Sequence, residues 1–508
     1  MKIYQSIQCL LQYGVQQRLL EKEDVTYSRN RILYVLGLDD WEECEGEGEE
    51  EELSLGVILN GILDWAFENG ILSSNSITER DILDTELMNC LMPRPSTVIS
   101  EFKENYLKSP KAATDHYYHL SLASNYIRKE RIAKNIQWKS RTPYGEMDIT
   151  INLSKPEKNP EEISLLKSTP QGSYPSCALC RENEGYSGNL RNAARATHRI
   201  IPLTLNNEKW FLQYSPYVYY NEHSIVFRGE HVPMKISADT FTRLLEFTDQ
   251  FPHYFIGSNA DLPIVGGSIL THDHFQGGRF EFALERAEIE ESISLTDYPS
   301  VTLGIVNWPM SVIRVRGKKD EVQAVTELIW KSWQNYSDPE ADVLAFSGNT
   351  PHNTVTPIAR RCGELFEMDV VLRNNRTSEE FPHGIFHPHE ELHHIKKENI
   401  GLIEVMGLAV LPGRLAEELS QAAEYLLCPV PKENWDESVV KHYDWIQKIL
   451  TKYQTIGKDE VMEIIEVEVG EVFQTVLEHA GIFKRTREGK NAFLNFLNSL
   501  QEASRLNR

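Results

Sequence analysis

Three polar side chains alternate along a short apolar segment near the middle of the chain: His272, His274 and Gln276. Glycine pairs bracket this segment, and a backbone without Cβ atoms lets a ligand approach closely. The apolar residues of segment 263–278 favour a buried strand. Because residues two apart in a strand share a face, the two imidazoles and the carboxamide are expected to point the same way. The segment is therefore the first candidate for a catalytic site.

Composition limits the classes of protein to consider. With 508 residues and 41% hydrophobic composition, the chain can form two or three domains with cores of their own. The net charge of −23 disfavours nucleic acid and anionic membranes as partners, although it allows a local cationic pocket for a small phosphate compound. No apolar run reaches the roughly 18 residues of a membrane span, and the first residues lack the features of a signal peptide. The seven cysteines are an odd number and mostly far apart, which predicts reduced thiols and a cytoplasmic protein.

The hydrophobic period changes near residue 140 and divides the chain. Apolar residues recur at three- and four-residue spacing before that point, whereas segment 147–153 alternates like a strand. From residue 415 onward the helical spacing returns and continues to the end. We therefore expect a mostly helical N-terminal region (1–135), an α+β catalytic region (136–412) and a helical C-terminal region (413–508).

Successive strands with turns between them are expected in the middle region. Aromatic and β-branched residues dominate these segments, and a helix is expected over 238–251 with Asp239 as its N-cap. Such a meander with inserted helices predicts an antiparallel α+β sheet and not a parallel doubly wound one. The expected strands are 147–153, 209–214, 217–220, 224–228, 263–278, 279–284, 301–306, 310–315, 366–373 and 401–410.

Cys177 and Cys180 form the chain's closest cysteine pair, in a loop marked by prolines and a glycine. Two thiolates at this spacing can reach one ion, as in a tetrahedral zinc site. One pair is half of such a site, so two unrelated free thiols are an equal alternative. No strand–helix unit surrounds the pair, which disfavours a thioredoxin-like redox role.

Two further segments have more than one interpretation. The basic segment 126–135 is either a helix face paired with acidic neighbours or a source of side chains that reach a substrate phosphate. The histidine-dense segment 383–394 is either a second metal site or a polar surface loop. Its Glu390 and Glu391 would repel phosphates, so it is a poor place for a phosphoryl-transfer nucleophile.

Several motifs together resemble a known family. The pattern from Thr271 to Gly278, the Cys177–Cys180 pair, the segment 220–223 and a length near 500 residues are similar to the class II galactose-1-phosphate uridylyltransferases of the histidine-triad superfamily. The resemblance extends from segment 126–135 to Pro412. It implies a histidine-triad-like antiparallel sheet core and a homodimer. Thr271 and Asp273 depart from the class I pattern, which has prolines there.

The resemblance implies a two-step transfer. His274, the nucleophile by family position, would attack the α-phosphorus of UDP-glucose and release glucose 1-phosphate, leaving a uridylyl-imidazole. Galactose 1-phosphate would then take the uridylyl group and leave as UDP-galactose. The leaving group is a phosphate that needs no strong acid, with a second pKa of about 6. A neutral Gln276 that donates a hydrogen bond to a non-bridging oxygen therefore suffices.

The resemblance also implies the surrounding ligands. Cys177, Cys180, His231 and His272 match a structural zinc site that would anchor the cysteine loop beside the nucleophile, and no organic cofactor is expected. Glu404 is a candidate metal ligand or partner of a substrate hydroxyl, with a buried hydrogen-bonded carboxylate as the alternative. Asn221 and Glu222 are expected to contact the uridine. Gly267 and Ser268 are expected to contact the phosphates.

Three other functions are compatible with parts of the pattern. A dinucleoside-polyphosphate phosphorylase, or another histidine-triad nucleotidyltransferase, shares the His-x-His-x-Gln chemistry but lacks the cysteine pair. A metal-dependent hydrolase would use His272 and His274 together as ligands. A zinc-binding scaffold without activity would tolerate the loss of His274.

Overall fold

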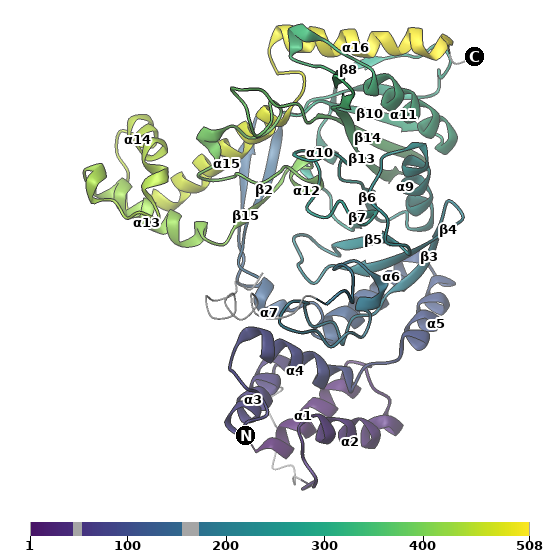
Figure 1. Cartoon of the computed structure of the whole chain (residues 1–508), viewed down its shortest axis with the longest axis vertical. Helices are drawn as coiled ribbons and strands as arrows, with labels where there is room; N and C mark the ends of the chain where they lie inside the picture. The colour runs from purple at the N-terminus through teal and green to yellow at the C-terminus, as the bar shows by residue number, and fades with distance from the viewer. Residues whose placement is uncertain (1, 44–52, 155–171, 507–508) are drawn as a thin grey trace.

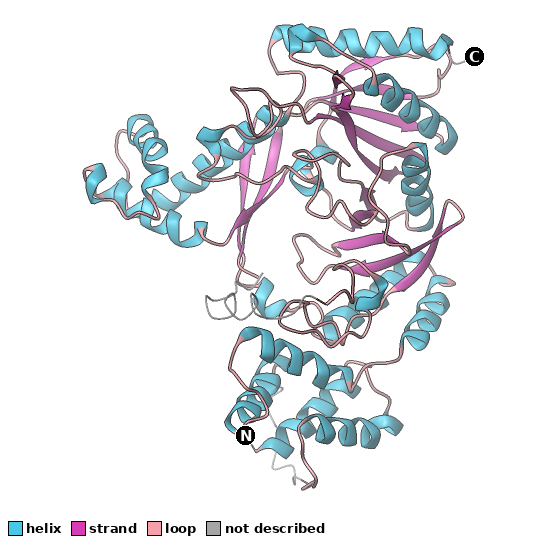
Figure 2. Cartoon of the chain, in the orientation of Figure 1, coloured by secondary structure: helices cyan, strands magenta, loops and turns pink. Residues whose placement is uncertain are grey.

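The computed structural model describes residues 2–43, 53–154 and 172–506. Helices from the N-terminal region form one end of an elongated molecule, and the C-terminal helix lies at the opposite end (Figure 1). Most strands fill the space between them, in one large and one small sheet (Figure 2). Strands β11 (Phe346–Ser347) and β12 (Thr350–Pro351) form a separate two-stranded sheet. The α+β fold class expected from the sequence is thereby confirmed.

The N-terminal helices begin at residues that suit helix starts. Side-chain oxygens of Ser54, Ser76 and Ser109 accept backbone N–H groups of the first turns of α3, α4 and α6. Apolar residues at helical spacing, such as Leu59 and Ile62, are buried in their core. The helices are α1 (Ile3–Gln16), α2 (Val25–Val35), α3 (Leu55–Glu68), α4 (Ile77–Asn89), α5 (Pro95–Tyr106), α6 (Pro110–Ala123) and α7 (Lys129–Ile132).

A ten-stranded sheet forms the centre of the molecule, and each pair of neighbouring strands is antiparallel. The strand order is β3-β4-β5-β7-β6-β13-β14-β10-β9-β8. Helices α9 (Ala238–Gln250) and α11 (Lys319–Gln334) pack against this sheet. The strands are β3 (Ile201–Leu205), β4 (Glu208–Tyr214), β5 (Ser224–Arg228), β6 (Phe255–Gly257), β7 (His274–Gly278), β8 (Ile289–Ile293), β9 (Thr302–Val306), β10 (Val312–Gly317), β13 (Asn353–Cys362) and β14 (Leu365–Asn374).

A smaller three-stranded sheet stands apart from the large one. Strands β1 (Ile136–Thr142) and β2 (Gly145–Asn152) form a hairpin, and β15 (Leu408–Pro412) joins β2 in parallel. Helix α15 contacts β1. The C-terminal helices are α13 (Leu415–Leu427), α14 (Tyr443–Lys452), α15 (Val461–Ala480) and α16 (Arg487–Leu506), as the apolar spacing predicted.

Some sequence-based assignments were wrong. Strand β7 covers only His274–Gly278, so the first part of segment 263–278 is loop and turn. Segments 217–220 and 279–284 are not strands, and the latter ends in the short helix α10 (Ala283–Arg286). Segment 401–410 contains helix α12 (Leu402–Val405) before β15, because the Glu404 carboxylate caps the helix by accepting the Gly401 N–H.

The N-cap of α9 also differs from the expectation. Ser237, and not Asp239, occupies this position and forms a capping box with Thr240. The amphipathic pattern thus located the helix and its first residue correctly, and only the N-cap was misplaced, by two positions.

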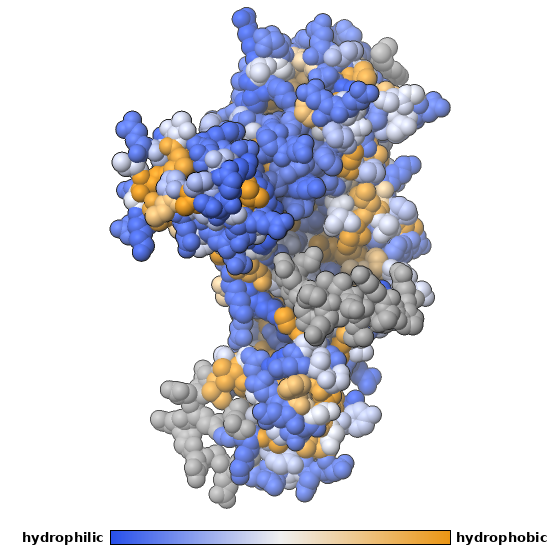
Figure 3. Space-filling view, turned by 60° about the vertical axis from the view of Figure 1, so that its left-hand side comes forward, coloured by the Kyte–Doolittle hydropathy of each residue, from blue (hydrophilic) through white to orange (hydrophobic). Residues whose placement is uncertain are grey.

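The surface shown in Figure 3 is predominantly hydrophilic. Within the described part of the chain, no helix is long and apolar enough to cross a membrane.

Candidate active site

A cavity of about 890 Å³ lies between the large sheet and the small one. His274 and Gln276 of β7 line it on one side, and the end of β15 lines it on the other. Gly266 and Gly267 form part of its wall, and a Cβ on Gly267 would lie 2.8 Å from the Asn259 side chain. Only a glycine fits this close approach. The other lining residues are Asn152, Tyr219, Asn259, Ser268, Lys396, Glu398, Asn399, Gly401, Leu402, Ile403, Glu404, Val410, Leu411, Pro412 and Gly413.

The backbone fixes the tautomer of His274. Its Nδ1 lies 2.8 Å from the carbonyl oxygen of His272, and because a carbonyl only accepts, Nδ1 carries the proton. The Nε2 atom therefore keeps its lone pair. Burial lowers the pKa of His274 to about 4, so the ring is neutral at pH 7. A neutral imidazole with a free Nε2 lone pair is a ready nucleophile.

A second histidine lies beside Gln276. Strand pairing places Gln276 opposite Ile225, and His223 is on the same face two residues away. His223 Nδ1 donates to the Tyr217 carbonyl over 3.0 Å, so its Nε2 is an acceptor. Burial lowers the pKa of His223 to about 4, and its Nε2 has no hydrogen-bond partner among the described residues. His223 ends the segment 220–223 that carries part of the family resemblance, but the sequence predicted no role for it.

A charged pair faces the same cavity from the far wall. Lys396 Nζ donates to Glu404 Oε1 over 2.8 Å, and Glu404 Oε2 accepts the Gly401 N–H over 3.1 Å. Asn259 Oδ1 accepts the Leu402 N–H over 2.9 Å and ties this wall to the loop after β6. Lys396 and Asn259 were missed by the sequence analysis because nothing local distinguishes them from other surface lysines and loop asparagines. Their location depends on contacts between distant segments.

Two of the expected substrate contacts lie outside the cavity lining. Glu222 is fully buried, where it pairs with Arg279 and accepts the Tyr254 hydroxyl. Asn221 Nδ2 donates to the Arg279 carbonyl over 3.3 Å. The structure therefore brings together His274, Gln276, Gly267, Ser268 and Glu404, but places Asn221 and Glu222 elsewhere.

Cys177, Cys180, His231 and His272 form a compact group that could hold a metal ion. Their donor atoms all lie within 4.8 Å of one another, including a Cys177 Sγ–His272 Nδ1 distance of 3.2 Å and a Cys180 Sγ–His231 Nδ1 distance of 3.1 Å. The Nε2 of His272 donates to the Arg228 carbonyl over 2.8 Å, which leaves Nδ1 as the donor atom for a metal.

The two thiols of this group differ in acidity. Burial opposes ionisation of Cys177, but its contact with His272 and the hydrogen bond from the Leu179 N–H outweigh burial and lower the pKa of this thiol, whereas burial and the neighbouring Cys177 raise the pKa of Cys180 to about 11. The thiolate is the form that binds metals. The four residues therefore fit a tetrahedral ion in both donor type and spacing. His272 and His274 direct their Nδ1 atoms to different partners, so the two do not act as one chelating pair.

The histidine-dense segment lies outside the His274 cavity. His389 and Glu391 form a three-donor group with His479 of α15, and the rings of His389 and His479 stack with centroids 4.1 Å apart. His387 Nδ1 faces the Pro388 carbonyl over 3.1 Å. None of these residues lines the cavity beside His274.

Comparisons with known proteins cover nearly the whole chain. The sequence models of the N-terminal and C-terminal domains of galactose-1-phosphate uridyl transferase match residues 18–233 and 246–447. The galactose-1-phosphate uridylyltransferase of Halalkalibacterium halodurans is 55% identical over 500 residues, covering 98% of each chain. That of Bacillus subtilis is 52% identical over 504 residues, also covering 98% of each chain. Among solved structures, yeast Ap4A phosphorylase Apa2 covers 60% of this chain and 88% of its own, with 11% identity and a TM-score of 0.32.

The two domain models and the curated relatives identify the chain as a nucleotidyltransferase. Within this class the assignment is specific, since two domain matches together span most of the residues. The chain belongs to the galactose-1-phosphate uridylyltransferase family. The resemblance drawn from the sequence motifs is thus confirmed.

Proposed function

We propose that the protein transfers a uridylyl group from UDP-glucose to galactose 1-phosphate, with His274 as the nucleophile. The observation that carries this proposal is the neutral His274 ring, whose Nδ1 proton is held by a backbone carbonyl while Nε2 remains unprotonated beside the cavity. An imidazole in this state attacks without first losing a proton.

In the first step, Nε2 bonds to the α-phosphorus of UDP-glucose. The bond from this phosphorus to the bridging oxygen breaks, and its electron pair leaves with glucose 1-phosphate. In the second step, a phosphate oxygen of galactose 1-phosphate attacks the same phosphorus and expels the neutral imidazole, giving UDP-galactose. The second step is the reverse of the first with a different sugar phosphate. One site can therefore catalyse both steps.

Gln276 is the proposed donor to a non-bridging oxygen of the transferred phosphate. His223 supports this role, because its Nε2, which has no partner among the described residues, can accept a hydrogen bond that the carboxamide Nε2 of Gln276 can supply. The second N–H of the same amide group then remains for the phosphate oxygen. Gly267 and Ser268 border the phosphate path, and Lys396, whose Nζ is paired with Glu404, lies across the cavity.

For Asn221 and Glu222 we propose an indirect role. The buried pair between Glu222 and Arg279 holds the turn that leads into β5, and thus supports His223 and the strand next to β7. We propose that Glu404 binds a hydroxyl of the sugar. Its Oε2 accepts the Gly401 N–H and so fixes the side chain at the start of α12, where the carboxylate lines the cavity.

Zinc is the metal we propose for Cys177, Cys180, His231 and His272. A closed Cys₂His₂ set is typical of structural zinc. The ion would connect the loop of Cys177 and Cys180 to His272, two residues before His274. The ion would contribute rigidity, while His274 performs the transfer. We further propose a cytoplasmic homodimer, in keeping with the cysteines in reduced form and with exposed Tyr27 and Tyr34 on α2.

Isotope exchange tests the proposed reaction. With UDP-glucose and labelled glucose 1-phosphate alone, label should enter UDP-glucose without galactose 1-phosphate, because the first step is reversible and complete in itself. Exchange that requires the second sugar phosphate would exclude the covalent route. Entry of label from ATP into diadenosine tetraphosphate, the exchange that an adenylyl-histidine intermediate allows, would favour the phosphorylase alternative.

A further inference from the structure

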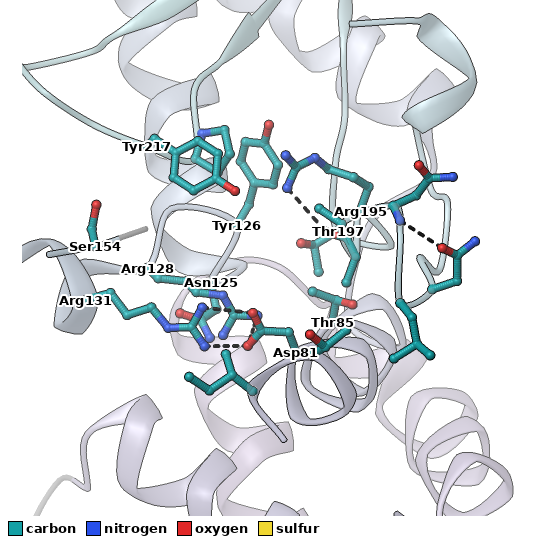
Figure 4. Close-up of a pocket in the computed structure, with 18 of the residues that line it drawn as sticks. Asp81, Thr85, Asn125, Tyr126, Arg128, Arg131, Ser154, Arg195, Thr197 and Tyr217 are labelled. Carbon is teal, nitrogen blue, oxygen red and sulfur yellow. Dashed lines mark hydrogen bonds and ion pairs between the residues drawn. The ribbon is translucent and has the colours of Figure 1, made fainter. Parts of the chain in front are cut away.

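A second cavity, of about 270 Å³, lies where the N-terminal helices meet the large sheet. Figure 4 shows Tyr126, Tyr217, Arg195 and Thr197 on one side of it and Arg128, Arg131 and Asp81 on the other. It shares no lining residue with the cavity beside His274 among the residues that the structure describes. The basic segment singled out in the sequence supplies one of its walls.

Two of the arginines in this wall are already neutralised. Arg131 makes a two-pronged contact with Asp81, at 2.8 and 2.5 Å, and Arg128 pairs with Asp84 at 3.1 Å. The two carboxylates balance the two guanidinium groups. This part of the cavity therefore has a rigid lining with little net charge.

Arg195 has no comparable partner. Its guanidinium lies over the Tyr126 ring, 5.8 Å from the centroid, and donates weakly to the Ala194 carbonyl over 3.4 Å. Within the described ranges, no carboxylate lies within ion-pair distance of it. In a protein with a net charge of −23, Arg195 therefore places a positive charge without a carboxylate partner beside this cavity.

The hydroxyl group of Thr197, beside the same cavity, lacks a hydrogen-bond partner within the described part of the chain. Its side chain is 2% exposed, and its Oγ1 has no hydrogen-bond partner among the described residues. An unpaired buried hydroxyl is costly, so a ligand atom that completes it would bind favourably. A hydroxyl donor and a guanidinium on one wall together suit an oxyanion.

We propose that the cavity lined by Arg195, Thr197, Tyr126 and Tyr217 binds the phosphate group of a small phosphate monoester. Arg195 supplies the charge, and Thr197 supplies a hydroxyl donor. The tyrosine rings and the size of the cavity leave room for a small polar body such as a sugar. This site is separate from the transfer site and goes beyond the proposed function.

Calorimetric titration tests the proposal with three probes: inorganic phosphate, galactose 1-phosphate and UMP. We expect galactose 1-phosphate to occupy two sites per chain in the natural protein. Arg195→Gln should weaken one of them at least tenfold, in line with loss of a charge-assisted hydrogen bond, and leave the other unchanged. Preference among the probes identifies whether free phosphate, the sugar or the nucleoside determines binding.

Thr197→Val and Arg141→Gln complete the design. Thr197→Val keeps the shape and the charge, so a weakening at the same site without loss of thermal stability confirms that the hydroxyl is used. Arg141 is exposed and lines neither cavity, so its variant should bind like the natural protein. Unchanged binding in Arg195→Gln would overturn the proposal. A parallel loss of uridylyl transfer from UDP-glucose to His274 would also overturn it, because the cavity would then belong to the transfer site.

Discussion

A single backbone contact decides what His274 can do. The resemblance of its motif to the family's implied this residue as the nucleophile, and the structure adds the reason why its Nε2 is unprotonated. That information could not come from the sequence, because the tautomer depends on which carbonyl lies beside Nδ1 in the folded chain. The same holds for His223, whose proximity to Gln276 follows from the pairing of β5 with β7.

Replacement of His274 by alanine removes the proposed nucleophile. We expect the rate of sugar exchange to fall on the order of 10⁴-fold or more, as for nucleophiles in other covalent mechanisms. The measurement is the steady-state rate of UDP-galactose formation. His383→Ala, on an exposed position of the histidine-dense segment, should retain the natural rate. Comparable activity in both variants would contradict the assignment.

The role of His223 is tested by a double-mutant cycle with Gln276. If His223 orients the carboxamide, His223→Ala and Gln276→Ala should each slow transfer by roughly 10- to 100-fold. The double variant should then be no slower than the slower single one, because the second change removes nothing further. The decrease should appear in kcat more than in KM. Multiplying effects would show that His223 acts independently of Gln276.

At the level of elements, the sequence predicted the type of structure better than its boundaries. Strands such as β4 and β14 were located correctly because their aromatic, β-branched and other apolar residues are a local signal that favours strands. Segment 401–410 was misassigned because an apolar run with a glycine is compatible with either a strand or a short helix. The cap formed by Glu404 resolves it into α12 and β15, and the wall of the cavity depends on that turn.

The loop that carries Cys177 and Cys180 should depend on its metal. Cys177→Ser removes one of four donors, so we expect loss of bound zinc and a decrease of about 2–5 kcal/mol in the free energy of unfolding, comparable to the loss of a structural cross-link. Metal analysis and thermal unfolding measure the two effects. Cys362→Ser, at an exposed cysteine, is the matched control and should change neither. Zinc retained at full stoichiometry in Cys177→Ser would exclude the four-donor site.

For the whole molecule, the sequence did not predict the topology of the sheets. It predicted an antiparallel α+β core, but the strand order and the separate three-stranded sheet depend on contacts between residues far apart in the chain. The 890 Å³ cavity lies between these two sheets, so its far wall was not predictable from local patterns. The division at residues 135 and 412 stays a prediction.

Buried neutral histidines should make the protein sensitive to acid. Burial lowers the pKa of His198 to about 3 and that of His223 to about 4, whereas an unfolded histidine has a pKa near 6.5. Between about pH 6.5 and 4 the unfolded chain therefore binds more protons, and stability is lost as the pH falls. Each group contributes a slope of up to about 1.4 kcal/mol per pH unit.

Urea unfolding at pH 7 and at pH 5 measures this effect. His198→Gln replaces an imidazole that contacts Gln213 by a neutral amide, and should reduce the difference between the two pH values. His116→Gln, at a partly exposed position, should leave the difference as it is in the natural protein. An equal effect of the two variants would show that His198 is not the group that takes up the proton.

The central claim is that the uridylyl group travels on His274, and the mass of the protein tests it most directly. After brief incubation with UDP-glucose and acid-free quenching, the intact chain should gain the mass of one uridylyl group, located to His274 by peptide mapping. Addition of galactose 1-phosphate should remove this mass and yield UDP-galactose at the same rate as turnover. A protein that exchanges the two sugars without ever gaining the mass, or that gains it on another residue, would contradict the account.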